Sequence, residues 1–226
     1  MRENGRHAST RSLRAPMKPA PAKAGSVRII GGRLRGSKLP VADRPGLRPT
    51  SDRVRETLFN WLQPVLPGAR VLDLFAGSGA LGFEAASRGA ASVVLVERDA
   101  ALAATLREQA TRLRVDTVQV RHADAVAWLR QEADGTFDVA FLDPPFDAGL
   151  WESAAVALAP RLAPGAWVYI ESPTGIRPSL PPGWHPHRGG STRDVEYALF
   201  RTADGPAPGP AGTLRAGLPP QGDPPA

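Results

Sequence analysis

Val71-Leu72-Asp73-Leu74-Phe75-Ala76-Gly77-Ser78-Gly79 predicts a buried strand that ends in a sharp, glycine-rich turn. Such a turn brings backbone N–H groups close to a ligand at the start of the following helix. Side chains at the two glycine positions would block that approach. The stretch therefore predicts a strand, a ligand-binding turn and a helix, which together form the opening unit of an α/β fold.

Strands and helices alternate from this stretch to the end of the patterned region. Strands are expected at 70–75, 92–97, 115–121, 137–142 and 166–171, with weaker signals at 184–189 and 194–201. Helices are expected at 80–88, 99–113, 124–131 and 148–162. This alternation predicts a doubly wound, mostly parallel sheet of the Rossmann-like kind.

Two shorter features precede the sheet. Residues 26–42 predict a hairpin, with strands at 27–30 and 33–39 around Gly31-Gly32 and basic side chains on one face. Thr50 is the expected N-cap of a helix over 51–65, because apolar residues follow it at helical spacing. We expect one domain over 26–201, made of this hairpin and helix (26–66) and an α/β core (67–201).

The two ends of the chain have different compositions from the middle. Residues 1–25 predict a disordered basic leader and 202–226 a disordered Pro/Gly-rich tail, although an organellar transit peptide and a start at Met17 are alternatives. The chain has no cysteine, which excludes disulfides, thiolate metal sites and a thiol nucleophile. No apolar run reaches the roughly 18 to 20 residues that span a bilayer, so we expect a cytoplasmic protein.

Positive charge is concentrated at the front of the chain. Residues 1–55 carry fourteen Lys or Arg against three acids, and residues 56–226 carry fourteen against nineteen, so the net charge of +6 divides into +11 and −5. Because phosphate contacts dominate nucleic-acid affinity, this asymmetry favours RNA or DNA as the partner. The alternative is a compositional bias, since Arg supplies 25 of the 28 basic residues.

Acidic residues stand at or just after the ends of four expected strands, at Asp73, Glu97, Asp124 and Asp143. Ligands of parallel sheets lie beyond the carboxyl ends of the strands, so these side chains should converge on one crevice. Asp73 suits a cationic ligand, Glu97 is placed to accept two ribose hydroxyls, and Asp124 with the N–H of Ala125 suits an adenine edge. These features favour S-adenosylmethionine, although Glu97 as an exposed acid and Asp124 as a helix cap are alternatives.

Asp143-Pro144-Pro145-Phe146 suits a flat, amino-bearing base. Two prolines fix the backbone and leave the Pro144 carbonyl beside a carboxylate. By accepting both hydrogens of an exocyclic amine, these two oxygens would localise its lone pair towards a methyl donor. Phe146 would stack on the base, which orients it for reaction. A rigid turn with Phe146 in the core is the structural alternative.

Other chemistries fit the sequence less well. Gly77-x-Gly79-x-x-Gly82 matches the dinucleotide fingerprint, but Asp73 would repel a pyrophosphate, and a nicotinamide oxidoreductase would need a substrate domain. His185 and His187 share a strand face without acidic companions, so we expect no metal. A non-catalytic RNA-binding protein remains a third class, in which Asp143 would be inert.

These motifs together resemble the class I S-adenosylmethionine-dependent methyltransferases that modify exocyclic base amines. More narrowly, Arg28-Ile29-Ile30-Gly31-Gly32, Leu47-Arg48-Pro49-Thr50 and the run from Asp52 to Trp61 resemble the bacterial 16S rRNA (guanine-N2)-methyltransferases of the RsmD family. The resemblance covers residues 26–201. DNA adenine-N6 methylation is the nearest alternative, but we expect no separate target-recognition domain in this sequence.

The resemblance implies a seven-stranded sheet whose last strand is antiparallel, a cofactor pocket roofed by the helix after Thr50, and a monomeric enzyme acting on ribosomal RNA within a small-subunit particle. It leaves open which guanine is modified. The resemblance also implies roles for three groups of residues. The expected catalytic residues are Asp143, Pro144, Pro145 and Phe146, and the expected cofactor-binding residues are Asp73, Ala76, Gly77, Ser78, Gly79, Glu97, Asp124 and Ala125. The expected RNA-binding residues are Arg28, Arg33, Arg35, Lys38, Arg48 and Arg53.

Overall fold

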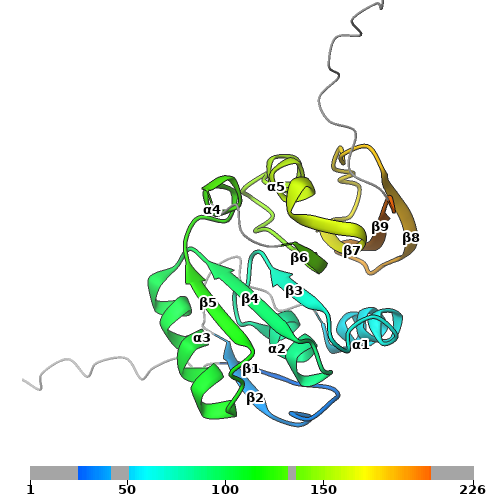
Figure 1. Cartoon of the computed structure of the whole chain (residues 1–226). Coiled ribbons are helices and arrows are strands. Elements are labelled where there is room, and N and C mark those ends of the chain that lie inside the picture. The colour runs from blue at the N-terminus through cyan, green and yellow to red at the C-terminus, as the bar shows by residue number, and fades with distance from the viewer. Residues whose placement is uncertain (1–24, 42–50, 132–135, 205–226) are drawn as a thin grey trace, which may run out of the picture.

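The computed structural model describes residues 25–41, 51–131 and 136–204 (Figure 1). Residues 1–24 of the expected leader, most of the expected tail, Arg48 and Thr50 lie outside these ranges. The division into a leader, a domain and a tail therefore stays a prediction.

A seven-stranded sheet in the order β5-β4-β3-β6-β7-β9-β8 forms the centre of the molecule. Its strands are β3 (Arg70–Asp73), β4 (Ser92–Glu97), β5 (Val118–His122), β6 (Phe137–Leu142), β7 (Leu162–Pro173), β8 (Trp184–Ser191) and β9 (Val195–Thr202). The pairs from β5 to β7 are parallel, whereas β9 is antiparallel to both of its neighbours. The expected Rossmann-like sheet with an antiparallel last strand is confirmed.

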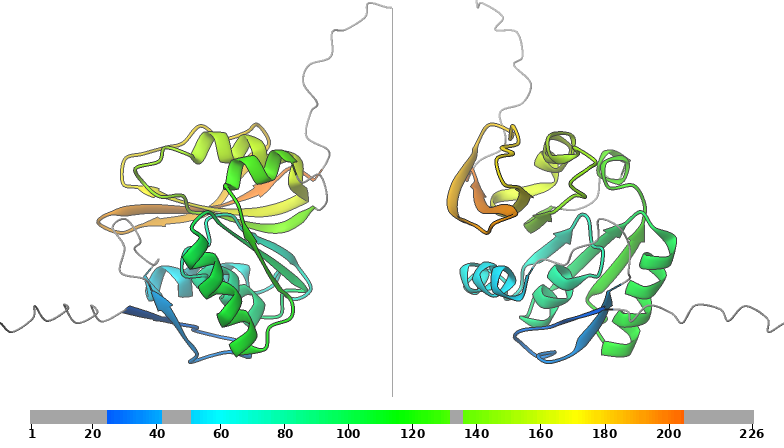
Figure 2. Two further views of the ribbon diagram at one scale, coloured as in Figure 1. Left: turned by 90° about the vertical axis from the view of Figure 1, so that its left-hand side faces the viewer. Right: turned by 180° about the vertical axis from the view of Figure 1, so that it is seen from behind.

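Helices cover both faces of this sheet (Figure 2). On one face lie α1 (Asp52–Leu62), α2 (Ala80–Ser87) and α3 (Ala100–Leu113), and on the other α4 (Ala125–Gln131) and α5 (Trp151–Leu158), which continues into the short 3₁₀ helix Ala159–Arg161. Strand side chains alternate between two cores, so that Val71 and Phe141 pack with the first helices, and Leu72 and Leu142 with the second.

The N-terminal hairpin is shorter than the sequence pattern predicts. Its strands β1 (Gly25–Arg28) and β2 (Lys38–Val41) are antiparallel, with Arg28 opposite Lys38 on the exposed face and Val27 opposite Leu39 on the buried face. The strand expected at 33–39 was wrong up to Ser37, because residues 33–36 form turns in which the Arg33 and Leu34 N–H groups bond to Ser87 of α2. The hairpin packs outside α2 and α3 (Figure 2).

Several helix boundaries also differ from expectation, most of all those of the first and last helices. Ser51, not Thr50, caps α1, since its hydroxyl accepts a hydrogen bond from the Val54 N–H at 3.3 Å. The helix ends at Leu62 instead of 65, because Pro64 has no N–H with which to extend the helical hydrogen bonds, although the C-cap Gln63 still has helical backbone angles. The helix expected at 148–162 begins only at Trp151, continues from Ala159 to Arg161 as a 3₁₀ helix, and gives its last residue, Leu162, to β7.

Candidate active site

The four acids of the sequence pattern occupy adjacent strand ends. In the register of the sheet, Asp73 pairs with Leu95 on one side and Phe141 on the other, so Glu97 and Asp143 each stand two residues beyond those partners. Asp124 follows β5, the neighbour of β4. The sheet therefore brings these loops to one edge, as the sequence predicted.

Asp73 is the last residue of β3, and it carries a buried carboxyl group shortly before the glycine-rich turn in the chain. Its Oδ2 accepts a hydrogen bond from the Gly82 N–H at 3.0 Å, and its side chain is 3% exposed. Burial raises the pKa of Asp73 to about 7, and the negative charge of Glu97 adds to this shift against the lowering effect of the backbone hydrogen bonds. The group is therefore poised to change its charge near neutral pH.

The turn itself has the geometry that glycine permits. Gly77 and Gly79 have φ angles of 52° and 75°, and a Cβ on Gly79 would come within 2.7 Å of Leu106 and Phe83. Gly79 is also the residue from which α2 begins. The half-buried Ser78 and the buried Ala76 complete the turn.

Glu97 holds this turn in place from the end of β4. Its Oε2 accepts a hydrogen bond from the Gly77 N–H at 2.9 Å, and its Oε1 accepts one from the Asp99 N–H at 2.8 Å. The side chain is half-buried, so it is not the exposed strand-end acid of the alternative interpretation. Each carboxylate oxygen has a further lone pair, so the predicted ribose contact is chemically compatible with these bonds.

Asp124 forms the helix cap that the sequence offered as an alternative role. Its Oδ1 accepts a hydrogen bond from the Ala127 N–H at 2.9 Å, which fixes the start of α4. Ala125 is the first residue of that helix, and the N–H groups of a first turn have no partner within the helix. The adenine contact stays a prediction, supported by the position of these groups next to Glu97, whose carbonyl accepts from the Ala123 N–H at 3.1 Å.

Asp143-Pro144-Pro145-Phe146 continues β6 away from the sheet. Asp143 is half-buried and Pro144 is buried. The Pro145 carbonyl accepts a hydrogen bond from the Ala148 N–H at 3.0 Å, whereas within the described residues no N–H donates to the Pro144 carbonyl. The Pro144 carbonyl thus has the acceptor capacity that the clamp on an amine requires.

Phe146 is exposed and is not packed in the core as in the structural alternative. Its side chain is 43% exposed, and its ring centroid lies 6.1 Å from that of Trp151. The two rings line a pocket of about 320 Å³ together with Ile176 and Arg177. An exposed aromatic face in this position is available for stacking on a base.

A buried Tyr169–Glu171 pair lies beside this loop and was missed by the sequence interpretation. The Tyr169 hydroxyl donates a hydrogen bond to Glu171 Oε2 at 2.7 Å, and the Trp151 Nε1 donates one to the Glu171 carbonyl at 2.7 Å. Burial and the negative charges of Glu171 and Asp143 raise the pKa of Tyr169 well above its usual value. Glu171 directly follows the apolar run 166–170 within β7, so the signal that identified Asp73 and Glu97 was present here too.

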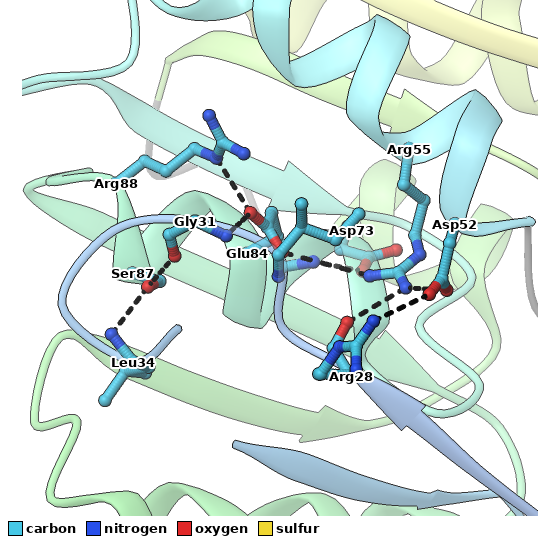
Figure 3. Close-up of polar contacts among 11 residues, drawn as sticks. Arg28, Gly31, Leu34, Asp52, Arg55, Asp73, Glu84, Ser87 and Arg88 are labelled. Atoms are coloured by element: carbon cyan, nitrogen blue, oxygen red, sulfur yellow. Dashed lines mark hydrogen bonds and ion pairs between the residues drawn. The ribbon is translucent and has the colours of Figure 1, made fainter. Parts of the chain in front are cut away.

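Glu84 on α2 is a second residue that the sequence did not identify (Figure 3). Its two carboxylate oxygens accept hydrogen bonds from the Ile30 and Gly31 N–H groups at 2.7 and 2.8 Å and from Arg88 Nε at 2.8 Å. The guanidinium of Arg55, which is fully buried, lies 3.8 Å away. Glu84 therefore joins α1, α2 and the loop after β1.

Ser87 makes the second connection between that loop and α2 (Figure 3). Its hydroxyl donates to the Gly31 carbonyl at 2.6 Å and accepts from the Leu34 N–H at 2.8 Å, while its carbonyl accepts from the Arg33 N–H at 2.8 Å. These bonds fix the backbone from which the basic side chains project.

The predicted RNA-binding residues that the structure describes lie on other elements than the four acids at the strand ends. Arg33, Arg35, Lys38 and Arg53 are exposed, and Arg28 is exposed but lies 3.9 Å from Asp52. They project from the hairpin, its loop and the start of α1, and Arg48 lies outside the described residues. Their contact with RNA stays a prediction.

No group of three or more potential metal ligands occurs in the part of the chain that the structure describes. The rings of His187 and Trp167 form a T-shaped pair with a centroid distance of 4.7 Å, and His187 and His185 line a pocket of about 460 Å³ near the end of β9. In residues 25–41, 51–131 and 136–204, no helix is long and apolar enough to cross a bilayer.

Comparison with known proteins agrees with this architecture. The model of a family described as "Conserved hypothetical protein 95" matches residues 27–201. The Escherichia coli K12 protein named "Ribosomal RNA small subunit methyltransferase D" is 46% identical over 189 residues, which cover 81% of this chain and 94% of that protein. Its namesake in Haemophilus influenzae is 42% identical over 80% of this chain and 96% of that protein.

A solved structure supports the same relationship in three dimensions. The structure titled "Putative methyltransferase yhhF from Escherichia coli" has a TM-score of 0.72 and 44% identity, covering 79% of this chain and 99% of that one. The sequence match extends over the hairpin, the glycine-rich turn and the Asp143 loop alike. This chain thus belongs to the ribosomal RNA small subunit methyltransferase D family, and it is a methyltransferase.

Proposed function

We propose that this methyltransferase uses S-adenosylmethionine to methylate the exocyclic N2 amine of a guanine in small-subunit ribosomal RNA. One observation carries the proposal: the half-buried Asp143, the Pro144 carbonyl and the exposed Phe146 ring stand together at the strand end beside Asp73 and Glu97. The names of the curated relatives support ribosomal RNA as the substrate class.

The residues at the ends of β3, β4 and β5 fit S-adenosylmethionine. Asp73 would hold the ammonium group, Glu97 the ribose hydroxyls, and Asp124 with the Ala125 N–H the adenine edge. The glycine-rich turn allows the backbone to approach the ligand closely. When bound, this cofactor supplies an electrophilic methyl group on a positively charged sulfur.

The Asp143 loop would activate the amine. An exocyclic base amine is a weak nucleophile because its lone pair is delocalised into the ring. By accepting the two hydrogens of N2, the Asp143 carboxylate and the Pro144 carbonyl localise that pair on nitrogen. Asp143 would then accept the proton that N2 loses as N2 bonds to the methyl carbon, while the bond between that carbon and sulfur breaks and its electron pair stays on sulfur. Phe146 stacks on the base and holds it in line.

Removal of the Asp143 carboxylate tests this assignment. We expect Asp143→Ala to lower turnover by at least about 100-fold, because proton acceptance and lone-pair localisation are both lost. Calorimetry should show nearly unchanged affinity for S-adenosylmethionine, since Asp143 is not among the cofactor contacts. Asp147→Ala is the matched control, because Asp147 is exposed in the same loop. Full activity of Asp143→Ala would refute the catalytic role.

A further inference from the structure

The loop that follows β7 lies beside the Asp143 loop. Because β6 and β7 are parallel neighbours, the loops that follow these two strands leave the same edge of the sheet. Together with the start of α5 they line a pocket of about 320 Å³, to which one loop contributes Phe146 and the other Ile176. Asp143 and Pro144, which the structure describes, do not line it. The pocket therefore adjoins the proposed stacking ring without including the oxygens that would hold the amine.

The walls of this pocket carry large apolar side chains that are exposed to solvent. Ile176 is 48% exposed and Phe146 is 43% exposed, whereas most large apolar residues of a folded protein are buried. In the part of the chain that the structure describes, Val156 is the one other exposed large apolar residue, and it does not line the pocket. Exposed apolar side chains around a pocket are typical of a binding surface. These walls suit a flat, partly apolar group such as a nucleobase.

Hydrogen bonds hold the loop of Ile176 in place. The Ser172 hydroxyl donates to the Ile176 carbonyl at 2.9 Å, and the Ile176 N–H donates to the Pro173 carbonyl at 3.0 Å. The Ser179 N–H donates to Glu152 Oε1 at 3.2 Å, which connects the loop to α5. Because this wall is fixed before a ligand arrives, it loses little conformational freedom on binding.

Arg177 supplies positive charge to the same pocket. Its side chain is exposed and lines the pocket next to Ile176. It forms no hydrogen bond or ion pair with any residue in 25–41, 51–131 and 136–204. Glu152, the acid among the lining residues, already accepts from the Ser179 N–H. A guanidinium in this situation matches a phosphate group, to which it can donate two parallel hydrogen bonds.

An RNA strand bound at the Asp143 loop would bring its next nucleotide to this pocket. In the proposed function Phe146 stacks on the target guanine, and the same residue lines the pocket. The nucleotide joined to that guanosine combines a base, which suits Ile176, with a phosphate, which suits Arg177. We propose that the pocket binds this neighbouring nucleotide, with its base packed against Ile176 and the phosphate that joins it to the target guanosine paired with Arg177. This inference rests on the proposed guanine-N2 activity.

A contact role and a structural role of Ile176 predict different responses to the neighbouring base. If Ile176 packs against that base, the losses caused by removing the side chain and by removing the base overlap. If Ile176 only shapes its own loop, its removal lowers methyl transfer by the same factor with and without the base. An apolar contact tolerates any base, since every base has a stacking face. The presence of the base, and not its identity, is therefore the variable to change.

The test uses small subunits reconstituted with intact RNA or with an abasic nucleotide directly 5′ or directly 3′ of the target guanine. Methyl transfer is measured as kcat/KM for the wild type and for Ile176→Ala. On intact subunits we expect the variant to lose about 5- to 10-fold, mainly through a higher KM, because the contact is remote from the reacting atoms. On subunits that lack the base on one of the two sides, this loss should shrink to less than about twofold.

A second variant tests the phosphate contact. We expect Arg177→Gln to raise KM for intact subunits. It should also reduce the steepness of log kcat/KM against log salt by roughly 0.7 to 1, because one phosphate contact is lost. Arg130→Gln removes the same charge from the exposed side of α4 and should leave the steepness unchanged. Unchanged steepness in Arg177→Gln would refute the contact between Arg177 and the phosphate.

Controls separate this inference from the proposed function. Val156→Ala shortens an exposed apolar side chain of α5 outside the pocket, and it should match the wild type on every substrate. Because wild type and variant are compared on the same particle, any effect of the abasic site on subunit assembly cancels. An equal loss for Ile176→Ala on intact and on both abasic particles, or no loss at all, would overturn the inference. Absence of N2-methylguanosine from intact particles treated with the wild type would instead overturn the proposed function.

Discussion

Asp73 shows how a single residue can report on cofactor binding through its charge. Because burial raises its pKa to about 7, the neutral acid dominates below that pH and the carboxylate above it. A cationic ligand binds the carboxylate form and stabilises it. The proposed contact with the cofactor ammonium therefore implies that binding releases a proton near neutral pH.

Cofactor affinity should consequently rise with pH. We assume that S-adenosylmethionine binds only to protein in which Asp73 is ionised. Its apparent dissociation constant should then fall by roughly five- to tenfold between pH 6 and pH 7.5, because the fraction of protein with ionised Asp73 increases. Calorimetry across this range checks the trend. Asp73→Asn should bind more weakly and without this pH dependence. An equally steep pH profile in that variant would assign the titration to another group.

At the scale of elements, the loop between β1 and β2 depends on α2. Glu84 accepts from the Ile30 and Gly31 N–H groups and from Arg88, and it lies beside the buried Arg55 (Figure 3). Removing one partner of a buried charged network leaves the other charges uncompensated. One carboxylate of α2 therefore contacts both the loop after β1 and the buried guanidinium of α1.

We expect Glu84→Gln to lower the free energy of unfolding by about 3 to 5 kcal/mol. The amide keeps the shape of the carboxylate but places an N–H group against the backbone donors or Arg55. Urea denaturation followed by circular dichroism measures the change. Glu108→Gln, on the exposed face of α3, should stay within about 0.5 kcal/mol of the wild type. A similarly small effect at Glu84 would contradict the proposed connection.

The exposed arginines of the same loop allow a test of RNA binding. We expect Arg33→Gln/Arg35→Gln to weaken RNA binding. The double variant should also reduce the steepness of log affinity against log salt by roughly 1 to 2, because binding releases fewer counterions from RNA when phosphate contacts are lost. Cofactor affinity should not change. The control Arg121→Gln/Arg130→Gln removes the same charge from β5 and α4. An unchanged slope in the loop variant would exclude these arginines from the interface.

Local sequence patterns predicted those parts of the molecule that depend on neighbours along the chain. The strand ends at Asp73, Glu97 and Asp143 follow apolar runs, and the turn after Asp73 is encoded by its own glycines. The turns at 33–36 were not predicted, because the N–H groups of Arg33 and Leu34 bond to Ser87, which lies 53 residues after Leu34 in the chain. The role of Glu84 was missed for the same reason, since its partner Ile30 is 54 residues distant.

At the scale of the whole molecule, the sheet separates two tasks. Its strand ends carry the acids and the Asp143 loop, while the hairpin packed outside α2 and α3 carries exposed basic side chains (Figure 2). The family match over residues 27–201 includes both parts. In the proposed function, the hairpin binds the phosphate backbone and the strand ends hold the cofactor and the base.

The most direct test of the account is transfer of tritium from labelled S-adenosylmethionine to small ribosomal subunits from a strain that lacks this protein, followed by nucleoside analysis. We expect the label in N2-methylguanosine and at least about 100-fold less of it with Asp143→Ala. Label in a different nucleoside, such as N6-methyladenosine, or no label from a protein that demonstrably binds the cofactor, would contradict the proposed guanine-N2 activity.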